Sequence, residues 1–153
     1  MAVRLAINGF GRIGRLVLRG ILESNRKDVE VVGINDLGSP EINRHLLKYD
    51  SVHGNLSDDI SVKGNILDVG TGPIKITAER DPEKLPWKEL QIDVALECTG
   101  LFTKREDAAK HLKAGAKKVL ISAPGTDADK TIVYGVNHNT LHGEDKIVSN
   151  ASC

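Results

Sequence analysis

The chain has 153 residues, of which 40% are apolar and 27% charged, a balance typical of a soluble globular domain. Lys plus Arg and Asp plus Glu both number 21, which argues against nucleic acid or an anionic membrane surface as a partner, because both attract a surplus of positive charge. No apolar run approaches the roughly 20 residues of a membrane span, and the N-terminus lacks the layout of a signal peptide. We therefore expect a cytoplasmic protein.

Strands and helices alternate at the beginning of the chain. Residues 3–8 form a short apolar run that ends at a glycine, which predicts a buried strand. Apolar residues then recur at helical spacing over residues 12–24. A second strand is expected over 29–35, and a helix is expected to begin at Pro40, where the missing N–H costs no hydrogen bond.

The middle of the chain is less regular. Short strands are expected at 60–62, 66–69 and 74–78, and the glycine-rich turns between them favour hairpins. Further strands are expected at 92–97, 118–122, 131–134 and 147–148, and a helix at 104–114. Alternating strands and helices imply a doubly wound, Rossmann-type α/β fold, with a mostly parallel sheet and helices on both faces.

A glycine-rich turn connects the first strand to the first helix. Residues 9–14, Gly-Phe-Gly-Arg-Ile-Gly, fit the pattern G-x-G-x-x-G, which is informative because a strand precedes it and a helix follows. Gly9 allows the tight turn, Gly11 lets the backbone approach a pyrophosphate, and Gly14 lets the helix pack closely on the strand. The helix N-terminus offers free N–H groups and about half a positive charge to phosphates. The alternative is a glycine-rich turn that only closes an ordinary α/β unit.

Asp36 supports the dinucleotide interpretation. It follows the second expected strand and lies 22 residues after Gly14 (36 − 14), close to the usual offset of about 20. Its carboxylate is expected to accept hydrogen bonds from the adenosine ribose hydroxyls. Because it would repel a 2′-phosphate, NAD is expected to bind in preference to NADP.

Two longer motifs point to one family. With Ala-Ile-Asn-Gly-Phe-Gly-Arg-Ile-Gly-Arg at 6–15 and Ser-Asn-Ala-Ser-Cys at 149–153, the chain closely resembles the glyceraldehyde-3-phosphate dehydrogenases. The segments at 47–54, 97–102 and 133–137 also match that family, so the resemblance spans the whole chain. It implies an NAD-dependent oxidoreductase of glycolysis that forms a cytoplasmic homotetramer, with a phosphorylated aldehyde and inorganic phosphate as substrates.

The resemblance also implies roles for individual residues. Cys153 would be the catalytic nucleophile and Ser152 the neighbouring substrate contact. Backbone N–H groups of Arg12 and Ile13 would hold the pyrophosphate, Arg80 with Thr99 would flank the adenine, and Gly100, Phe102 and Ser122 would line the cleft toward the nicotinamide. Together with the glycine-turn analysis, the residues expected to bind cofactor are Asn8, Gly9, Gly11, Arg12, Ile13, Asp36, Arg80, Thr99, Gly100, Phe102 and Ser122.

A cysteine suits the implied reaction. Its thiolate attacks the aldehyde, the resulting thiohemiacetal passes hydride to NAD, and phosphate captures the thioester as an acyl phosphate. We expect residues 1–148 to form the NAD-binding domain and 149–153 to begin the active-site segment. Members of the family continue for about another half chain that supplies the activating histidine, so this chain alone is expected to be inactive.

Several alternatives remain open. The closely related erythrose-4-phosphate dehydrogenases share nearly the same motifs, and a non-catalytic NAD-binding module is a rival from another class. Cys98 is expected to be a core thiol. The five histidines show no metal-ligand pattern, so we expect them on the surface or in loops and expect no metal site. Asp50 and His53 are expected in a loop beside the cofactor cleft.

Overall fold

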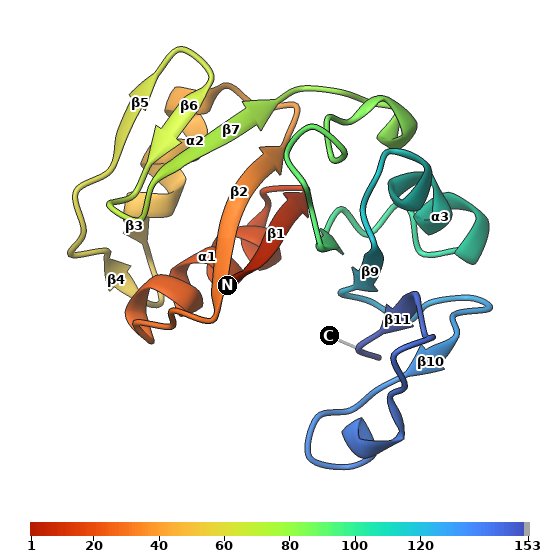
Figure 1. Cartoon of the computed structure of the whole chain (residues 1–153). Coiled ribbons are helices and arrows are strands. Elements are labelled where there is room, and N and C mark those ends of the chain that lie inside the picture. The colour runs from red at the N-terminus through yellow and green to blue at the C-terminus, as the bar shows by residue number, and fades with distance from the viewer. Residues whose placement is uncertain (152–153) are drawn as a thin grey trace.

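Parallel strands form the centre of the molecule (Figure 1). The computed structural model describes residues 1–151, and the main sheet has the strand order β10-β11-β9-β8-β1-β2-β7-β6-β5. The parallel part comprises β1 (Val3–Asn8), β2 (Val29–Asn35), β7 (Pro73–Thr77), β8 (Val94–Glu97), β9 (Lys118–Ile121), β10 (Lys130–Thr131) and β11 (Ile147–Ser149). The chain winds outward from β1 in one direction through β2 and in the other through β8. This arrangement confirms the predicted doubly wound fold.

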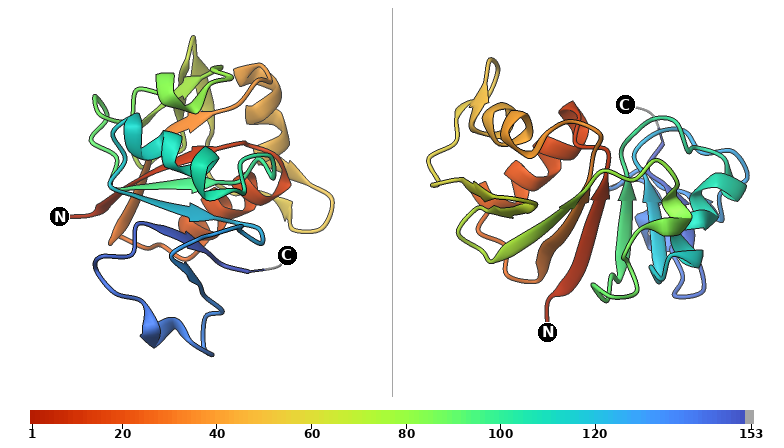
Figure 2. Two further views of the ribbon diagram at one scale, coloured as in Figure 1. Left: turned by 90° about the vertical axis from the view of Figure 1, so that its right-hand side faces the viewer. Right: turned by 90° about the horizontal axis from the view of Figure 1, so that it is seen from above.

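Helices cover both faces of the sheet, as predicted (Figure 2). On one face lie α1 (Arg12–Glu23) and α2 (Pro40–Lys48), and on the other lies α3 (Arg105–Lys113). Leu18 of α1 is 1% exposed and packs in the same core cluster as Ile7 of β1, whereas Ala108 of α3 packs against Val119 of β9. Pro40 occupies the first turn of α2, and the Ser39 hydroxyl caps that helix.

The irregular middle of the chain extends the edge of the sheet. Here β5 (Ser61–Lys63) pairs antiparallel with β6 (Ile66–Asp68), which pairs antiparallel with β7, as the glycine-rich turns predicted. A second, smaller hairpin consists of β3 (Tyr49–Asp50) and β4 (Gly54–Asn55), where only a loop was expected. Two short 3-10 helices, η1 (Pro82–Lys84) and η2 (His138–Thr140), complete the described elements.

A buried arginine fastens the small hairpin to α1. Arg19 is 3% exposed, and its guanidinium donates to the carbonyl oxygens of His53 (2.9 Å) and Gly54 (2.8 Å). Its Nε also donates to Glu23 at 2.7 Å, so the buried charge is neutralised within the same helix. The position of the hairpin therefore depends on α1, the helix that begins at the glycine-rich turn.

The strand expected at 131–134 is wrong in extent. β10 ends at Thr131, although the N–H of Ile132 still donates to the carbonyl of Ser149 at 2.7 Å, and the chain turns from residue 134 onward. The side chain of Asn137 accepts the N–H of Val133 at 2.7 Å, and the carbonyl of Val133 accepts the N–H of Val136 at 3.0 Å. These local hydrogen bonds replace the pairing that a longer strand would need.

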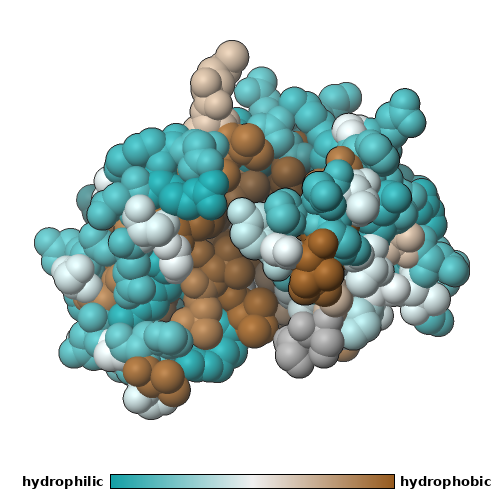
Figure 3. All heavy atoms as spheres, turned by 90° about the horizontal axis from the view of Figure 1, so that it is seen from below, coloured by the Kyte–Doolittle hydropathy of each residue, from teal (hydrophilic) through white to brown (hydrophobic). Residues whose placement is uncertain are grey.

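One side of the sheet is less completely covered than the other. Ile7, Leu96, Leu120 and Val148 form a row across four neighbouring strands, and the last two are only partly buried. On the opposite face, beside α3, Val119 is 1% exposed. Figure 3 shows an apolar band between two polar lobes on the surface seen from below. None of the helices within residues 1–151 combines the length and apolar character needed to cross a bilayer.

Candidate functional site

A pocket of about 240 Å³ lies at the carboxyl ends of the central parallel strands. β2 and β8 flank β1 on opposite sides, so this is the point where the winding direction reverses and where α/β sheets of this type bind ligands. The lining residues are Asn8, Gly9, Asn35, Leu37, Glu79, Arg80, Thr99, Leu101 and Phe102. Five of these were expected from the sequence to bind cofactor, namely Asn8, Gly9, Arg80, Thr99 and Phe102.

The three glycines of the turn lie in different surroundings. Gly9 has φ +90° and faces the loop at Thr99, where a Cβ would lie 2.8 Å from the Thr99 backbone nitrogen. A Cβ at Gly14 would lie 2.2 Å from the carbonyl oxygen of Gly9, so the helix can approach the turn only without a side chain there. At Gly11 a Cβ would meet no protein atom within 4 Å. The protein itself therefore requires glycine at the first and third positions, and the second position faces open space.

The N-terminus of α1 is left open beside Gly11. Gly11 is the N-cap residue, no side chain within residues 1–151 caps this end, and the first turn contains no acidic residue. The N–H groups of the first turn include those of Arg12 and Ile13, and the helix itself cannot satisfy them. This end of α1 can therefore accept an anion.

The side chain of Arg12 points away from this turn to the small hairpin. Its Nη1 donates to Oδ2 of Asp50 at 2.6 Å, and the Asp50 side chain is only 7% exposed. Asp50 also accepts the backbone N–H groups of His53 (2.8 Å) and Val52 (2.9 Å). The Arg12 guanidinium and these N–H groups hold the pKa of Asp50 well below its usual range. Asp50 thus orders the hairpin.

Asp36 joins the end of β2 to the glycine-rich turn. Its Oδ1 accepts the N–H of Phe10 at 2.9 Å. Its Oδ2 accepts the N–H of Gly38 at 2.9 Å and the side-chain amide of Asn43 at 3.3 Å. A carboxylate has about four acceptor positions, so this half-buried group can accept a further hydrogen bond.

The expectation that all five histidines lie on the surface or in loops is wrong for His111. This residue of α3 is 0% exposed, and its Nε2 lies 2.9 Å from Oε1 of Glu97, which is 1% exposed. The indole N–H of Trp87 donates to its Nδ1 at 2.9 Å. The sequence signal was the position of His111 three residues after Ala108, on the buried stripe of α3. Nothing in the local sequence named its partners.

The remaining predicted residues lie around the pocket or outside the described part of the chain. Gly100 has φ +75° in the exposed loop that follows β8. Ser122 follows β9, is half-buried, and donates its hydroxyl to the carbonyl of Glu97 at 3.1 Å. Cys98 lies between these segments against the core, and burial raises the pKa of its thiol. Ser152 and Cys153 fall outside the residues that the structure describes.

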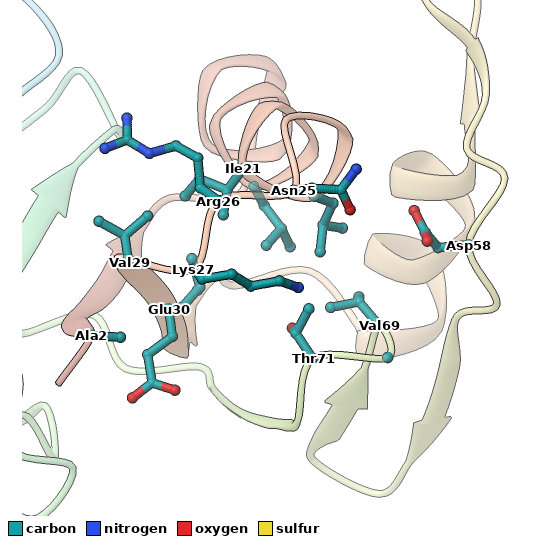
Figure 4. A pocket seen from close by; sticks show the side chains of 14 residues that line it. Ala2, Ile21, Asn25, Arg26, Lys27, Val29, Glu30, Asp58, Val69 and Thr71 are labelled. Atoms are coloured by element: carbon teal, nitrogen blue, oxygen red, sulfur yellow. The ribbon is translucent and has the colours of Figure 1, made fainter.

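A second hollow, of about 360 Å³, lies at the amino-terminal edge of the sheet (Figure 4). Its lining includes apolar Leu18 and Val69 and the long side chain of Lys27. None of the residues expected from the sequence to bind cofactor lines it. The residues expected to bind a dinucleotide therefore lie at the other end of the sheet, by the carboxyl ends of the strands.

Comparison with known proteins agrees with the Rossmann-type fold. Residues 3–105 match the family described as "Glyceraldehyde 3-phosphate dehydrogenase, NAD binding domain". A glyceraldehyde-3-phosphate dehydrogenase of Xanthobacter flavus is 62% identical over all of this chain and 46% of its own length. Proteins of the same name from Cereibacter sphaeroides and Geobacillus stearothermophilus are 60% and 56% identical, again over 100% of this chain and 45% of their own length. The chain thus spans about half the length of the curated relatives it matches. It belongs to the glyceraldehyde 3-phosphate dehydrogenase family.

Proposed function

We propose that residues 1–148 bind NAD in the crevice between the carboxyl ends of β1, β2 and β8. The N–H groups of Arg12 and Ile13 hold the pyrophosphate, and Asp36 accepts the ribose hydroxyls. The observation that carries the proposal is the contrast among the three glycines: Gly9 and Gly14 face protein atoms, whereas Gly11 faces open space at an uncapped helix end.

The two ends of the cofactor occupy different parts of the crevice in this proposal. The adenine lies in the pocket of about 240 Å³, between Arg80 and Thr99. The nicotinamide end runs toward Gly100, Phe102 and Ser122. NAD supplies a hydride acceptor when bound, and the residues of this chain bind and orient it.

Titration calorimetry with NAD tests cofactor binding by the 153-residue chain. We expect saturable binding with one site per chain, because the pocket and the open N-terminus of α1 lie beside the same glycine-rich turn. ADP-ribose, which keeps the adenosine and the pyrophosphate, is expected to bind at the same site and to compete with NAD. A chain that is folded by circular dichroism and yet gives no saturable heat with NAD contradicts the proposal.

We further propose that the full-length protein is a phosphorylating glyceraldehyde-3-phosphate dehydrogenase. The alignment covers all of this chain and only 46% of the Xanthobacter relative, which is named glyceraldehyde-3-phosphate dehydrogenase. In this proposal residues 149–153 begin the active-site segment, Cys153 forms the thioester that inorganic phosphate cleaves, and Ser152 contacts the substrate. A thiolate suits both steps because it is a strong nucleophile and a competent leaving group.

Activity of the full-length protein tests this second proposal. We expect NADH production from glyceraldehyde 3-phosphate to require inorganic phosphate, and Cys153→Ser to lower it by about a thousandfold or more, because a serine hydroxyl is not ionised near neutral pH. NAD binding by that variant is the control and is expected to persist. Faster turnover of erythrose 4-phosphate would show that the protein is an erythrose-4-phosphate dehydrogenase. NAD binding without turnover of either aldehyde would show that it is a non-catalytic NAD-binding module.

The assembly and the compartment are part of the same proposal. We place the protein in the cytoplasm as a homotetramer, and the exposed apolar residues of α2 and the small hairpin support self-association. Ile42, Leu46 and Tyr49 follow one another at helical spacing and are 57%, 39% and 49% exposed, and Val52 is 73% exposed. Sedimentation velocity of the same full-length preparation reports its oligomeric state, and a monomer would contradict the tetramer.

A further inference from the structure

A buried carboxylate lies behind the adenine pocket. Glu97 ends β8, is 1% exposed, and accepts hydrogen bonds from three different residues. Its Oε1 lies 2.6 Å from the side-chain nitrogen of Asn8 and 2.9 Å from Nε2 of His111. Its Oε2 accepts both the backbone N–H (3.0 Å) and the hydroxyl (2.5 Å) of Thr99. A buried charge with four donors is well satisfied, so this group holds its neighbours in one arrangement.

The Thr99 contacts shape one wall of the pocket. Because the Thr99 hydroxyl donates to Glu97, its oxygen is free to accept, and it accepts the N–H of Leu101 at 3.1 Å. Glu97 therefore determines the course of the loop that follows β8. Thr99, Leu101 and Phe102 of this loop line the pocket.

The Asn8 contact reaches the opposite wall. A carboxylate only accepts hydrogen bonds, so Asn8 must present its NH₂ to Glu97 and its carbonyl oxygen to Asn35. The amide nitrogen of Asn35 donates to that oxygen at 2.8 Å, which leaves the Asn35 oxygen to accept the N–H of Glu79 and the hydroxyl of Thr77, each at 2.8 Å. The Glu97 carboxylate therefore sets the orientation of both amides. Through Asn35 and the N–H of Glu79, it also holds the segment that carries Arg80.

Trp87 and His111 support the carboxylate from the other side. An indole N–H can only donate, so Nδ1 of His111 carries no proton and Nε2 donates to Glu97. Trp87 and His111 are both 0% exposed and line no part of the pocket. A hydrogen-bonded path therefore runs from the pocket wall at Thr99 through Glu97 to the one tryptophan of the chain.

We propose that Glu97 is a positioning residue for the adenosine end of the dinucleotide: its carboxylate holds the Thr99 wall and, through Asn8 and Asn35, the Arg80 wall of the pocket at the spacing that the adenosine requires. The proposal rests on the proposed binding of NAD. Neither Glu97 nor His111 was identified from the sequence as part of the site.

Glu97→Gln tests the proposal in the 153-residue chain. A glutamine replaces one acceptor oxygen with a donor group, so it cannot satisfy the donors of Asn8, His111 and Thr99 together. We expect the Kd for NAD and for ADP-ribose to rise about tenfold or more. Glu106→Gln, an exposed acid at the start of α3, is the matched control and is expected to leave both constants unchanged. A purely structural defect would lower the number of competent sites in calorimetry and leave the Kd of the folded fraction unchanged.

The single tryptophan supplies an independent readout. In the wild-type chain, saturation with ADP-ribose is expected to shift the one indole N–H resonance in a ¹⁵N–¹H spectrum, although Trp87 does not line the pocket. If Glu97→Gln folds and binds both ligands as tightly as the wild type, the positioning role is wrong and NAD binding stands. If that variant does not fold, an unshifted Trp87 resonance in the ligand-saturated wild type overturns the proposal. A folded wild-type chain that binds neither ligand overturns the proposed function and this inference together.

Discussion

Gly11→Val is expected to weaken NAD binding by at least about a hundredfold while the sheet stays folded. Gly11 has φ −72°, which a valine can adopt, and an added Cβ would touch no protein atom within 4 Å. The valine methyl groups would instead occupy the space in front of the N–H groups of α1, where the pyrophosphate is proposed to lie. Calorimetry with NAD measures the loss, and thermal unfolding confirms that the variant is folded.

Two other glycines of the same helix make this test specific. Gly20→Val is the matched control: Gly20 is exposed, has no protein atom within 4 Å of an added Cβ, and lies about two and a half turns from the proposed pyrophosphate site. We expect the NAD affinity of Gly20→Val to equal that of the wild type. Gly14→Ala is expected instead to destabilise the fold itself, because its Cβ would lie 2.2 Å from the carbonyl oxygen of Gly9. Unchanged NAD binding by folded Gly11→Val would show that the turn has only a structural role.

Asp36 is expected to make the chain bind NAD at least about a hundredfold more tightly than NADP. Two like charges about 4 Å apart repel by about 4 kcal/mol at an effective dielectric constant of about 20, and a 2′-phosphate would approach this carboxylate. The N–H groups of Phe10 and Gly38 hold the carboxylate in place, so it cannot easily turn away from the added phosphate. Paired titrations with NAD and NADP measure the ratio of the two constants.

Asp36→Asn separates the charge of this residue from its shape. The amide can keep the hydrogen bond from Phe10, and Asn43 can rotate its own amide to accept from the new NH₂ group, whereas the hydrogen bond from the N–H of Gly38 is lost. We expect the preference for NAD to fall by about tenfold or more, mainly through tighter binding of NADP. Asp59→Asn makes the same change of charge at an exposed position outside the pocket and should preserve the preference. Equal affinities of the wild type for the two cofactors would refute the role given to Asp36.

Local patterns in the sequence were sufficient for the fold class and for part of the site. The buried strand, the glycine-rich turn and the helix follow one another within residues 3–23, so their spacing alone predicted them. The position of Asp36 directly after β2 was predicted in the same way, because its distance from Gly14 along the chain reflects one strand–helix–strand unit. Strands, turns and helices depend on residues that are neighbours in sequence, so the spacing of apolar residues and glycines predicts them.

Only the tertiary structure decided how the strands are ordered and which polar groups are buried. Glu97 contacts Asn8, which is 89 residues away in sequence, and His111, which is 14 residues away, and no local pattern links these three side chains. In the sequence, Arg19 likewise resembles an ordinary polar helix residue. Its burial depends on the small hairpin, where carbonyl groups 34 and 35 residues later accept hydrogen bonds from its guanidinium. A charged group can be buried only where such partners converge, and their convergence depends on strand order and packing. The sequence by itself therefore determined the Rossmann class and the position of the glycine-rich turn, whereas the fold alone decided which side chains form the walls and floor of the pocket.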